Sequence, residues 1–433
     1  MRIIIVTWGS DGDVRPYLSL ALGLKRTGHE VQLATHIAYQ EFVNNYGIEC
    51  LPMDWNIAGS LDGILNFRPL DTIILGAKQL DNGLLGELWR VCQQAEAIIF
   101  NPHSYPCYYI AEKLGIPCYA ASVQPHHPTR AFPHPWVTNG KPLGKPLGNI
   151  YNWFSYLFFD QVFWQFIRRP INQWRQEKLN IPSLPIWEGV IRRMQQQKIP
   201  LLYGYSSYLL PKPSEWTDDS IHVTGYWFLD SSENWQPPTD LMNFLSAGSP
   251  PVYISKLWNQ DKLSKEVLLE LLALTGQRII VQALDDDYDI GLTDKLDKLF
   301  FIQGSIPHEW LFPKMAAVVH HGGLGTIMTS LRAGVPMVTI PVHADTDHLF
   351  WALQIAQSGL GISLISHKEQ LSVESLATAI KVAVSDQNIK LRVTEISKKI
   401  QNEDGVRQAI EAFHQHLPCN QLLETSTFKL KTV

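Results

Sequence analysis

The sequence predicts an α/β protein built from two doubly wound domains. At 433 residues the chain exceeds the size of one ordinary hydrophobic core, so two domains are the default expectation. Residues 2–35 and 97–122 each alternate a buried strand, an amphipathic helix and a second strand. Residues 316–341 repeat that order around a glycine-rich turn. Such β-α-β units form parallel sheets covered by helices.

The first half supplies two of these units, which place one domain at residues 1–210. Gly28 ends the first helix in the usual C-terminal manner. The predicted elements are the strand Arg2–Trp8, the turn Gly9–Asp13, the helix Val14–Thr27, the strand Glu30–Thr35, the strand Ala97–Phe100, the helix Tyr105–Leu114 and the strand Pro117–Ser122.

Asp13 is the candidate functional residue of this domain. It lies in the loop at the carboxyl end of the first predicted strand, where side chains of an open α/β sheet reach the ligand crevice. Aspartate before a helix is also a common N-cap, whose carboxylate accepts a backbone N–H bond. The residues alone leave both roles open, and the two are compatible.

Residues 139–198 differ in composition from the rest of the first half. A loop rich in glycine and proline precedes what reads as a helical pair, and nine Lys/Arg face three acids between Lys141 and Lys198. One interpretation is a hydrophobic pocket with a basic rim that touches anionic lipid. The other is a subdomain with its own core and a solvated charged face. We expect a blend, in which most of the aromatics form the core and a minority line a pocket. One narrow helix stripe cannot hold all ten, so some must face another surface or a pocket: Tyr151, Trp153, Phe154, Tyr156, Phe158, Phe159, Phe163, Trp164, Phe166 and Trp174.

Residues 211–240 have the proline and polar content of an interdomain linker. The second domain is expected at 241–390, and residues 391–433 are expected to form a helix that crosses back and a mobile tail from Pro418. Its predicted elements include the strands Pro251–Ser255 and Arg278–Ala283 and the helices Val373–Val384 and Ile389–His414.

The stretch Ala316–Ala352 organises the second domain. A strand at Ala316–Val319 leads into a glycine-rich turn and then directly into a helix at Thr326–Arg332. The unpaired N–H groups and dipole of that helix favour an anion by roughly 0.3–1 kcal/mol. His321 adds a donor or a positive charge, and Asp345 follows the next predicted strand. A phosphate group beside a carboxylate is therefore predicted here.

Charge and cysteine content narrow the class of protein. A formal charge of −5 and a pI near 6.3 give no global reason to bind nucleic acid. Five cysteines without a C-x-x-C pair suit a reducing compartment better than a disulfide framework or a zinc site. The N-terminal apolar run is too short for a signal peptide, and no run reaches the length of a membrane span. We expect a cytoplasmic protein that binds small molecules.

Several motifs carry a resemblance to a known family. The stretch after residue 303 reads GSIPHEWLFPKMAAVV, then HHGGLGT, LRAGVP and HADTDHLFWA. Together these resemble the nucleotide-sugar signature of GT-B glycosyltransferases, in the branch that holds sterol and antibiotic glycosyltransferases. Near the N-terminus, GDVRP resembles the glycine-acid-x-x-Pro turn of the same branch. The implied fold is GT-B, two Rossmann-like domains facing across a cleft.

The resemblance also implies an activity. It is the inverting transfer of a hexose from a UDP- or TDP-sugar, used as co-substrate without a cofactor or a metal, to a hydroxyl of a lipophilic sterol-, terpenoid-, carotenoid- or polyketide-like acceptor. Asp13 would be the general base. The donor-binding residues would be Ser10, Gly12, Ser255, Ser305, Ile306, His321, Gly323, Gly325, Thr326, Asp345 and Thr346. Apart from the resemblance, His126 and His127 follow the strand that ends near Ser122; they either orient an acceptor or assist Asp13, or are ordinary histidines of a proline-rich surface loop. Trp153 and Phe163 are further acceptor-binding candidates.

The sequence also departs from that family. The strand at Pro251–Ser255 usually continues into a G-x-G-S-like turn, whereas this chain has Ser255-Lys256-Leu257-Trp258-Asn259, and Thr346 replaces a frequent glutamine. An Asp285-x-Asp287 pattern resembles a metal motif of another glycosyltransferase fold, but we expect a surface loop. The alternatives are a nucleotide-sugar epimerase or hydrolase and a non-catalytic partner protein.

Overall fold

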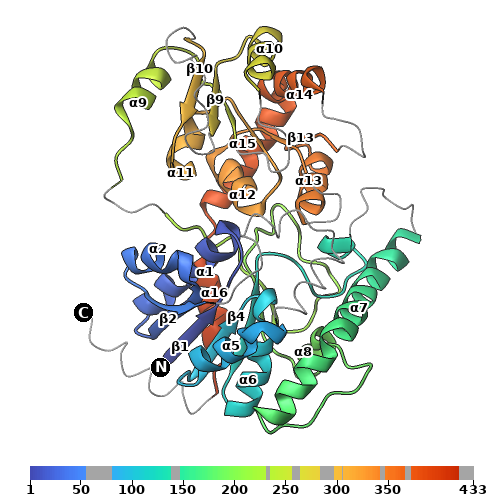
Figure 1. Ribbon diagram of the computed structural model, residues 1–433. Coiled ribbons are helices and arrows are strands. Elements are labelled where there is room, and N and C mark those ends of the chain that lie inside the picture. Colours follow the sequence, from blue (N-terminus) through green and yellow to red (C-terminus); the bar gives the residue numbers. More distant parts are fainter. Residues whose placement is uncertain are drawn as a thin grey trace.

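The computed structural model describes residues 1–54, 80–137, 147–230, 235–255, 264–282, 297–304, 306–341, 347–365 and 372–418. Within these residues the chain forms two lobes, each built on a parallel sheet with helices around it (Figure 1). The predicted fold class, two Rossmann-like α/β domains, is confirmed.

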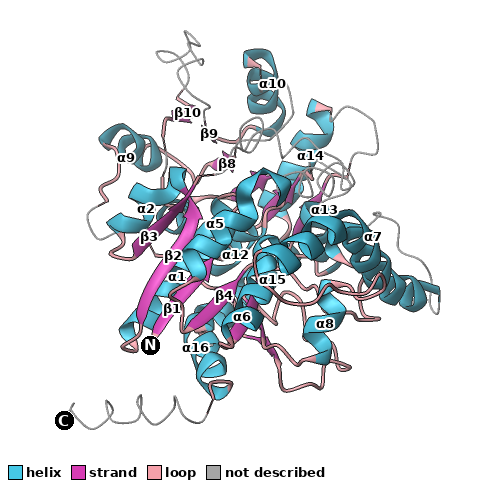
Figure 2. Ribbon diagram, turned by 60° about the horizontal axis from the view of Figure 1, so that its bottom comes forward, coloured by secondary structure: helices cyan, strands magenta, loops and turns pink. Residues whose placement is uncertain are grey.

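The first described sheet has seven strands in the order β3-β2-β1-β4-β5-β6-β7, and every pair is parallel. Alternate residues of β1 point to opposite faces, since Ile3 and Ile5 pack with α1 and α2 while Ile4 and Val6 pack with α5, α6 and α7 (Figure 2). The strands are β1 Arg2–Val6, β2 Glu30–His36, β3 Glu49–Met53, β4 Ala97–Phe100, β5 Cys118–Ser122, β6 Leu201–Tyr203 and β7 Ile221–Val223; the helices are α1 Asp11–Arg26, α2 Gln40–Asn45, α5 Leu85–Cys92, α6 Pro106–Leu114, α7 Leu147–Glu177 and α8 Val190–Gln196.

The second described sheet has six strands in the order β10-β9-β8-β11-β12-β13, again all parallel. Its two faces are covered by separate apolar clusters, so it has a core of its own. The strands are β8 Val252–Ile254, β9 Ile279–Gln282, β10 Leu299–Ile302, β11 Ala317–His320, β12 Met337–Thr339 and β13 Gly361–Ser363; the helices are α9 Thr239–Ser246, α10 Lys265–Thr275, α11 His308–Leu311, α12 Leu324–Ala333, α13 Asp347–Gln357, α14 Val373–Ser385, α15 Gln387–Gln401 and α16 Gly405–Gln415.

The last helix, α16, returns to the first lobe and lies beside α1 (Figure 1). The start of α16 packs directly on the backbone of the segment at Gly225. No side chain fits between them, because a Cβ on Gly405 would stand 2.6 Å from the backbone of Gly225. Phe413 is buried in the first core, and its carbonyl accepts a hydrogen bond of 3.0 Å from the Tyr119 hydroxyl. The two lobes are therefore joined by α16 as well as by the connecting segment.

Two local expectations need correction. The aromatic segment predicted as a helical pair is one helix, α7, which continues through Pro170. A proline inside a helix costs about 3 kcal/mol, and the burial of Ile167 and Ile171 on either side of it offsets that cost. Within the range 211–240, the described residues include β7, which pairs with β6. The exact domain boundaries stay a prediction.

Candidate active site

The candidate site lies where the carboxyl ends of the strands of both sheets meet. The loops after β1, β4 and β5 bring Asp13, His103 and Gln124, and the segments after β11 and β12 bring His321 and Asp347. In open parallel sheets, ligands bind at this edge. A described cavity of about 300 Å³ near Glu112 and His416 borders the opposite, amino ends of β5 and β6 and has no part in this site.

Asp13 lies in the first turn of α1, which begins at Asp11, three residues earlier than predicted. Ser10 is the N-cap residue, and its backbone N–H and hydroxyl donate to Asp13 Oδ2 at 2.9 and 3.0 Å. Thr7 completes the turn, since its hydroxyl donates to the Asp13 carbonyl at 2.6 Å. Asp13 is thus the third helical residue of a capping box rather than the N-cap, and its carboxylate is held in one orientation.

Gly9 makes room for that carboxylate. Its φ of +139° disfavours any residue with a side chain, and an added Cβ would lie 2.3 Å from Asp13 Oδ2. The glycine is therefore needed both for the backbone conformation and for the close approach of the acid.

The mouth of α12 is capped differently. The helix begins at Leu324, two residues earlier than predicted, and its N-cap is Gly323, which offers no side-chain cap. Gly325 and Thr326 consequently lie in the first helical turn, where backbone N–H groups have no intrahelical partner. The arrangement suits an anionic oxygen.

His321 folds over this mouth as a neutral ring. Burial, followed by the neighbouring His348 and His308, lowers the pKa of His321 to about 3. The ring packs against His348 at 4.6 Å, and a Cβ on Gly323 would lie 2.7 Å from His321 Nε2. Of the two roles expected for His321, a donor or a positive charge, the lowered pKa favours the neutral donor.

Asp347 is a site residue that the sequence interpretation missed. It is the first residue of α13, and its Oδ2 accepts a hydrogen bond of 2.8 Å from Gln124 Nε2 in the other lobe. Gln124 Oε1 in turn accepts a hydrogen bond of 2.8 Å from Trp136 Nε1. This relay of Trp136, Gln124 and Asp347 joins the two lobes at the site. The only local signal is the position of Asp347 directly before the apolar pattern of a helix.

Burial, followed by the nearby Asp13 carboxylate, raises the pKa of Asp347 to about 7. His103 acts in the opposite direction. His103 stacks on Trp136 at 5.5 Å and lies 5.2 Å from Trp8, ring centre to ring centre. The Asp13 carboxylate of one domain thus raises the pKa of the Asp347 carboxyl group of the other, close to the rings of His103, Trp136 and Trp8.

Tyr226 connects the helix mouth to the start of α1. A Cβ on Gly325 would lie 3.2 Å from the Tyr226 hydroxyl. Burial raises the pKa of Tyr226, and the Asp13 carboxylate raises it further, while Arg15 lowers it. The phenol is therefore neutral and lies between the two elements. Tyr226 belongs to the segment that the sequence predicted to be linker.

Each of the four predicted acceptor residues occupies a different environment. The His126 ring is buried against Trp136, its Nδ1 lies 3.1 Å from His134 Nε2, and burial lowers its pKa to about 3. His127 turns toward Trp216 instead. Phe163 packs on the core of the first lobe, whereas Trp153 is exposed on the outer side of α7. Only His126 adjoins the relay between the lobes.

The remaining predicted donor residues are placed as follows. Ser255 ends β8, and its buried hydroxyl has no hydrogen-bond partner among the described residues. Ile306 is buried beside α11, so only its backbone is available. Gly12 lies in the exposed first turn of α1. Outside the described residues lie Ser305, Asp345, Thr346, Lys256–Asn259 and the Asp285-x-Asp287 pattern.

Comparisons with known proteins agree with this geometry. Residues 3–133 match the glycosyltransferase family 28 N-terminal domain, and residues 266–408 match the erythromycin biosynthesis protein CIII-like C-terminal domain. The sterol 3-beta-glucosyltransferase of Arabidopsis thaliana is 34% identical over 450 aligned positions, covering 100% of this chain and 70% of the relative. The chain belongs to the GT-B glycosyltransferases.

Other members of the GT-B glycosyltransferases extend the comparison. The sterol 3-beta-glucosyltransferase of Komagataella phaffii is 34% identical over 99% of this chain, but the chain spans only 35% of that protein. Among solved structures, the glycosyltransferase of kitacinnamycin matches with a TM-score of 0.70 at 18% identity, covering 96% of this chain and 99% of the other. VinC in complex with dTDP matches with a TM-score of 0.65 at 16% identity, covering 95% and 100%. The predicted family is confirmed.

Proposed function

We propose that this GT-B glycosyltransferase moves a hexose from a UDP- or TDP-sugar to a hydroxyl of a lipophilic small molecule, with inversion at the anomeric carbon. Support for a lipophilic acceptor comes from relatives that are sterol 3-beta-glucosyltransferases. A nucleotide-diphosphate donor is supported by VinC, whose structure contains dTDP. Sterols are one member of the proposed acceptor class, and the sugar and the base are left open.

In the proposed reaction, Asp13 takes the proton from the acceptor hydroxyl as its oxygen attacks the anomeric carbon. The bond from that carbon to the diphosphate oxygen breaks, and the diphosphate leaves toward the first-turn N–H groups of α12. Ser10 fixes Asp13 Oδ2, so the other carboxylate oxygen is oriented for proton transfer. His321, held neutral, offers a ring N–H rather than a charge.

One observation carries this proposal. The Asp13 carboxylate and the uncapped mouth of α12 lie near the same residues, because Asp13 raises the pKa of Asp347 and of Tyr226, and the Tyr226 hydroxyl lies 3.2 Å from where a Cβ on Gly325 would stand. A base and an anion site that belong to different domains thus share one space. This is the arrangement that a direct displacement requires.

We further assign Asp347 to the sugar hydroxyls, since it is the carboxylate that meets Gln124 between the lobes. Asp345 and Thr346 stay predictions. Metal independence also stays a prediction, although the described residues include no group of three or more His, Cys, Asp and Glu that could hold a metal ion. A cytoplasmic setting is proposed, supported by four described cysteines that are buried free thiols.

The test is a product screen. The purified chain is incubated with UDP- and TDP-hexoses and a mixed lipophilic extract, and mass spectrometry detects products heavier by one hexose. Such a product supports the proposal. Donor hydrolysis that is independent of any acceptor would favour a hydrolase. Calorimetry that shows no binding of UDP or TDP would favour the non-catalytic alternative.

A further inference from the structure

The helix α7 carries apolar side chains on two opposite faces. Its inner face is buried in the first lobe through Trp164, Ile167 and Ile171. Its outer face presents the exposed Leu147, Ile150 and Phe154, spaced three or four residues apart, and then the exposed pair Leu157 and Phe158 three and four residues further on. With the exposed Trp187, we call this set the outer ridge. A helix that is apolar all round needs an apolar neighbour on each face.

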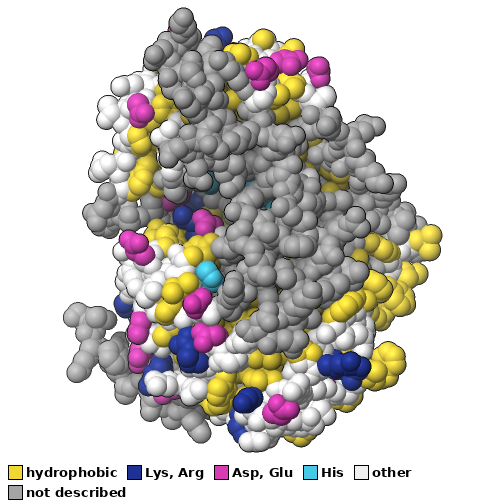
Figure 3. All heavy atoms as spheres, in the orientation of Figure 1, with side chains coloured by type: hydrophobic (Ala, Val, Ile, Leu, Met, Phe, Trp, Pro, Cys, Tyr) yellow, Lys and Arg dark blue, Asp and Glu magenta, His cyan; other side chains and the backbone are white. Residues whose placement is uncertain are grey.

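The loop after α7 widens the outer ridge. Trp187 is 70% exposed although it is the largest side chain of that loop. Gln161 Nε2 donates to the Trp187 carbonyl at 3.4 Å, and Gln165 Nε2 donates to the Ile186 carbonyl at 2.7 Å. The loop is therefore fastened along the helix. Figure 3 shows hydrophobic side chains gathered along this edge of the molecule, with Lys and Arg side chains near its lower end.

The charge beside the outer ridge is positive. Arg169 and Arg192 are exposed, and neither forms an ion pair with a described residue. Two of the three acids in this segment are engaged. Asp160 is buried, accepts from the Ile191 N–H at 3.2 Å and lies within the electrostatic reach of Arg192, and Glu188 pairs with Arg193 at 2.8 Å. The third acid, Glu177, is exposed and accepts a hydrogen bond of 3.1 Å from Gln173 Nε2. Exposed arginines thus outnumber exposed acids in this segment.

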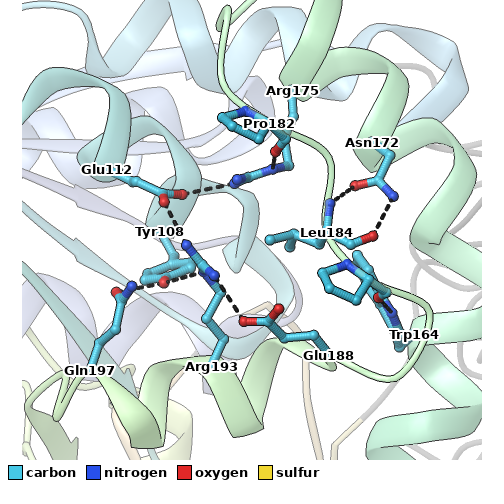
Figure 4. Close-up of polar contacts among 11 residues, drawn as sticks. Tyr108, Glu112, Trp164, Asn172, Arg175, Pro182, Leu184, Glu188, Arg193 and Gln197 are labelled. Atoms are coloured by element: carbon cyan, nitrogen blue, oxygen red, sulfur yellow. Dashed lines mark hydrogen bonds and ion pairs between the residues drawn. The ribbon is translucent and has the colours of Figure 1, made fainter.

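The inner side of this segment is held firmly. Glu112 of α6 accepts hydrogen bonds from Arg175 Nη1 at 2.8 Å and from Arg193 Nη2 at 2.6 Å (Figure 4). Asn172 bonds the Leu184 backbone in both directions, at 2.8 and 3.0 Å. These contacts fix α7 and its following loop to the lobe. The outer ridge is consequently a preformed surface that need not order on contact.

We propose that the outer ridge is a docking surface for a lipid bilayer with anionic headgroups. Aromatic side chains such as Trp187 suit the boundary between headgroups and acyl chains, and Arg169 and Arg192 suit the phosphates above it. Two copies of the chain meeting ridge to ridge would bring Arg169 and Arg192 of both copies together, and the only exposed acid of the described part of this segment is Glu177, eight residues beyond Arg169. Charge complementarity therefore selects the lipid surface.

The location of the ridge links it to the active site. Phe159, on the inner side of α7, stacks on His134 at 4.1 Å and contacts Trp136 at 5.5 Å. Trp136 bonds Gln124, the residue that meets Asp347. One helix therefore separates the bilayer surface from the acceptor side of the site. This step rests on the proposed function, because it makes the bilayer the source of the lipophilic acceptor.

The test compares vesicle binding of the full chain and three variants: an apolar pair, called the double variant, a control, and an arginine pair. One variant combines Phe158→Ser and Trp187→Ser, and the control is Leu391→Ser, a leucine 68% exposed on α15 in the other lobe. Co-sedimentation uses phosphatidylcholine vesicles with and without phosphatidylglycerol. The double variant should lose about tenfold or more in partitioning, while the control binds like the unaltered chain. Arg169→Gln with Arg192→Gln should lose about tenfold or more on anionic vesicles and little on neutral ones.

Three results would overturn the proposal: no sedimentation of the unaltered chain, equal binding by the double variant, or a dimer of the unaltered chain that the double variant dissolves without any change in vesicle binding. Glycosyl transfer to a detergent-dispersed acceptor is measured in parallel. The double variant should retain it in detergent and lose it for acceptor held in vesicles. Loss of transfer by every form, with vesicle binding intact, would reject the proposed function and leave the docking surface standing.

Discussion

The starts of α1 and α12 are built alike but finish differently. Each follows a buried strand and a glycine-containing turn at the carboxyl edge of a parallel sheet. At α1 the helix mouth is filled by the chain itself, since Ser10 and Asp13 form a capping box. At α12 the cap is Gly323, which supplies no side chain. The side-chain capping at the start of α1 fixes the Asp13 carboxylate. The start of α12 has no such cap, so its first backbone N–H groups remain for an external anion.

The two mouths also differ in charge. The α1 side presents acids, Asp11 and Asp13, in its first turn. The α12 side is lined by His320 and His321, whose pKa values burial lowers, so both rings are neutral near pH 7. The difference teaches that the donor side does not depend on a titratable cation. Its affinity for an anion comes from backbone dipoles in a buried setting.

The largest predicted effect comes from replacing the Asp13 carboxylate with an amide of the same shape. Asp13→Asn should lower kcat by about 10²–10⁴-fold, because the amide cannot accept the acceptor proton. Affinity for UDP or TDP, measured by calorimetry, should change little. Asn still accepts the Ser10 N–H bond, so thermal stability should hardly move. Asp11→Asn is the matched control: Asp11 lies two residues before Asp13 in the same first turn, and among the described residues it pairs with Arg15 and Tyr39. If Asp13→Asn is as active as Asp11→Asn, the acid serves only as a cap.

The second prediction displaces the carboxylate without removing it. Gly9→Ala puts a Cβ where Asp13 Oδ2 lies, so kcat should fall by about 10²-fold through misplacement of the base. Gly28→Ala shares the positive φ but has no atom within 4 Å of the new Cβ. Steady-state kinetics and thermal unfolding are measured for both variants. The comparison separates the effect of backbone strain, which both share, from the effect of displacing the Asp13 carboxylate, which only Gly9→Ala produces. Equal kinetic losses in the two variants would contradict the assigned role of Gly9.

The third prediction fills the open mouth. Gly323 has backbone angles that any residue can adopt, φ −63° and ψ 136°, although an added Cβ would lie 2.7 Å from His321 Nε2 and must displace that ring equally in both variants. Gly323→Asp and Gly323→Asn are nearly isosteric and both can cap α12. The aspartate should bind UDP or TDP about tenfold more weakly than the asparagine, because its charge repels the diphosphate. Equal dissociation constants in calorimetry would show that the anion binds elsewhere.

The smallest predicted effect concerns the electrostatic coupling between Asp13 in the first lobe and Asp347 in the second. The pKa of Asp347 is raised to about 7 by burial and by Asp13, so Asp13→Asn should lower it. Since the folded pKa lies above the unfolded value of 3.8, the stability that Asp347 contributes is present below about pH 4 and lost as the pH rises toward 7. That loss should be smaller in Asp13→Asn. Infrared carboxyl bands, differenced against Asp347→Asn, measure the titration, and an unchanged midpoint would refute the coupling.

What the sequence could predict follows from how local each feature is. The β-α-β periodicity and the HHGGLGT turn are contained in short stretches, and they predicted the fold class and the open helix mouth. Asp13 was predicted as a candidate because its place directly after the first strand is also local, whereas its position inside a capping box was not predicted. Asp347 and Tyr226 could not be predicted in the same way, since their positions depend on how two domains meet. The neutral state of His321 depends on burial, which a motif does not show.

The account's central claim is that the open mouth of α12 holds the donor diphosphate opposite Asp13. A crystal structure of the chain with bound UDP-hexose tests it most directly. We predict a phosphate oxygen within about 3 Å of the N–H groups of residues 324–326 and the Asp13 carboxylate facing the anomeric carbon. A diphosphate bound away from that mouth, or a sugar on the far side of the molecule from Asp13, would contradict the account.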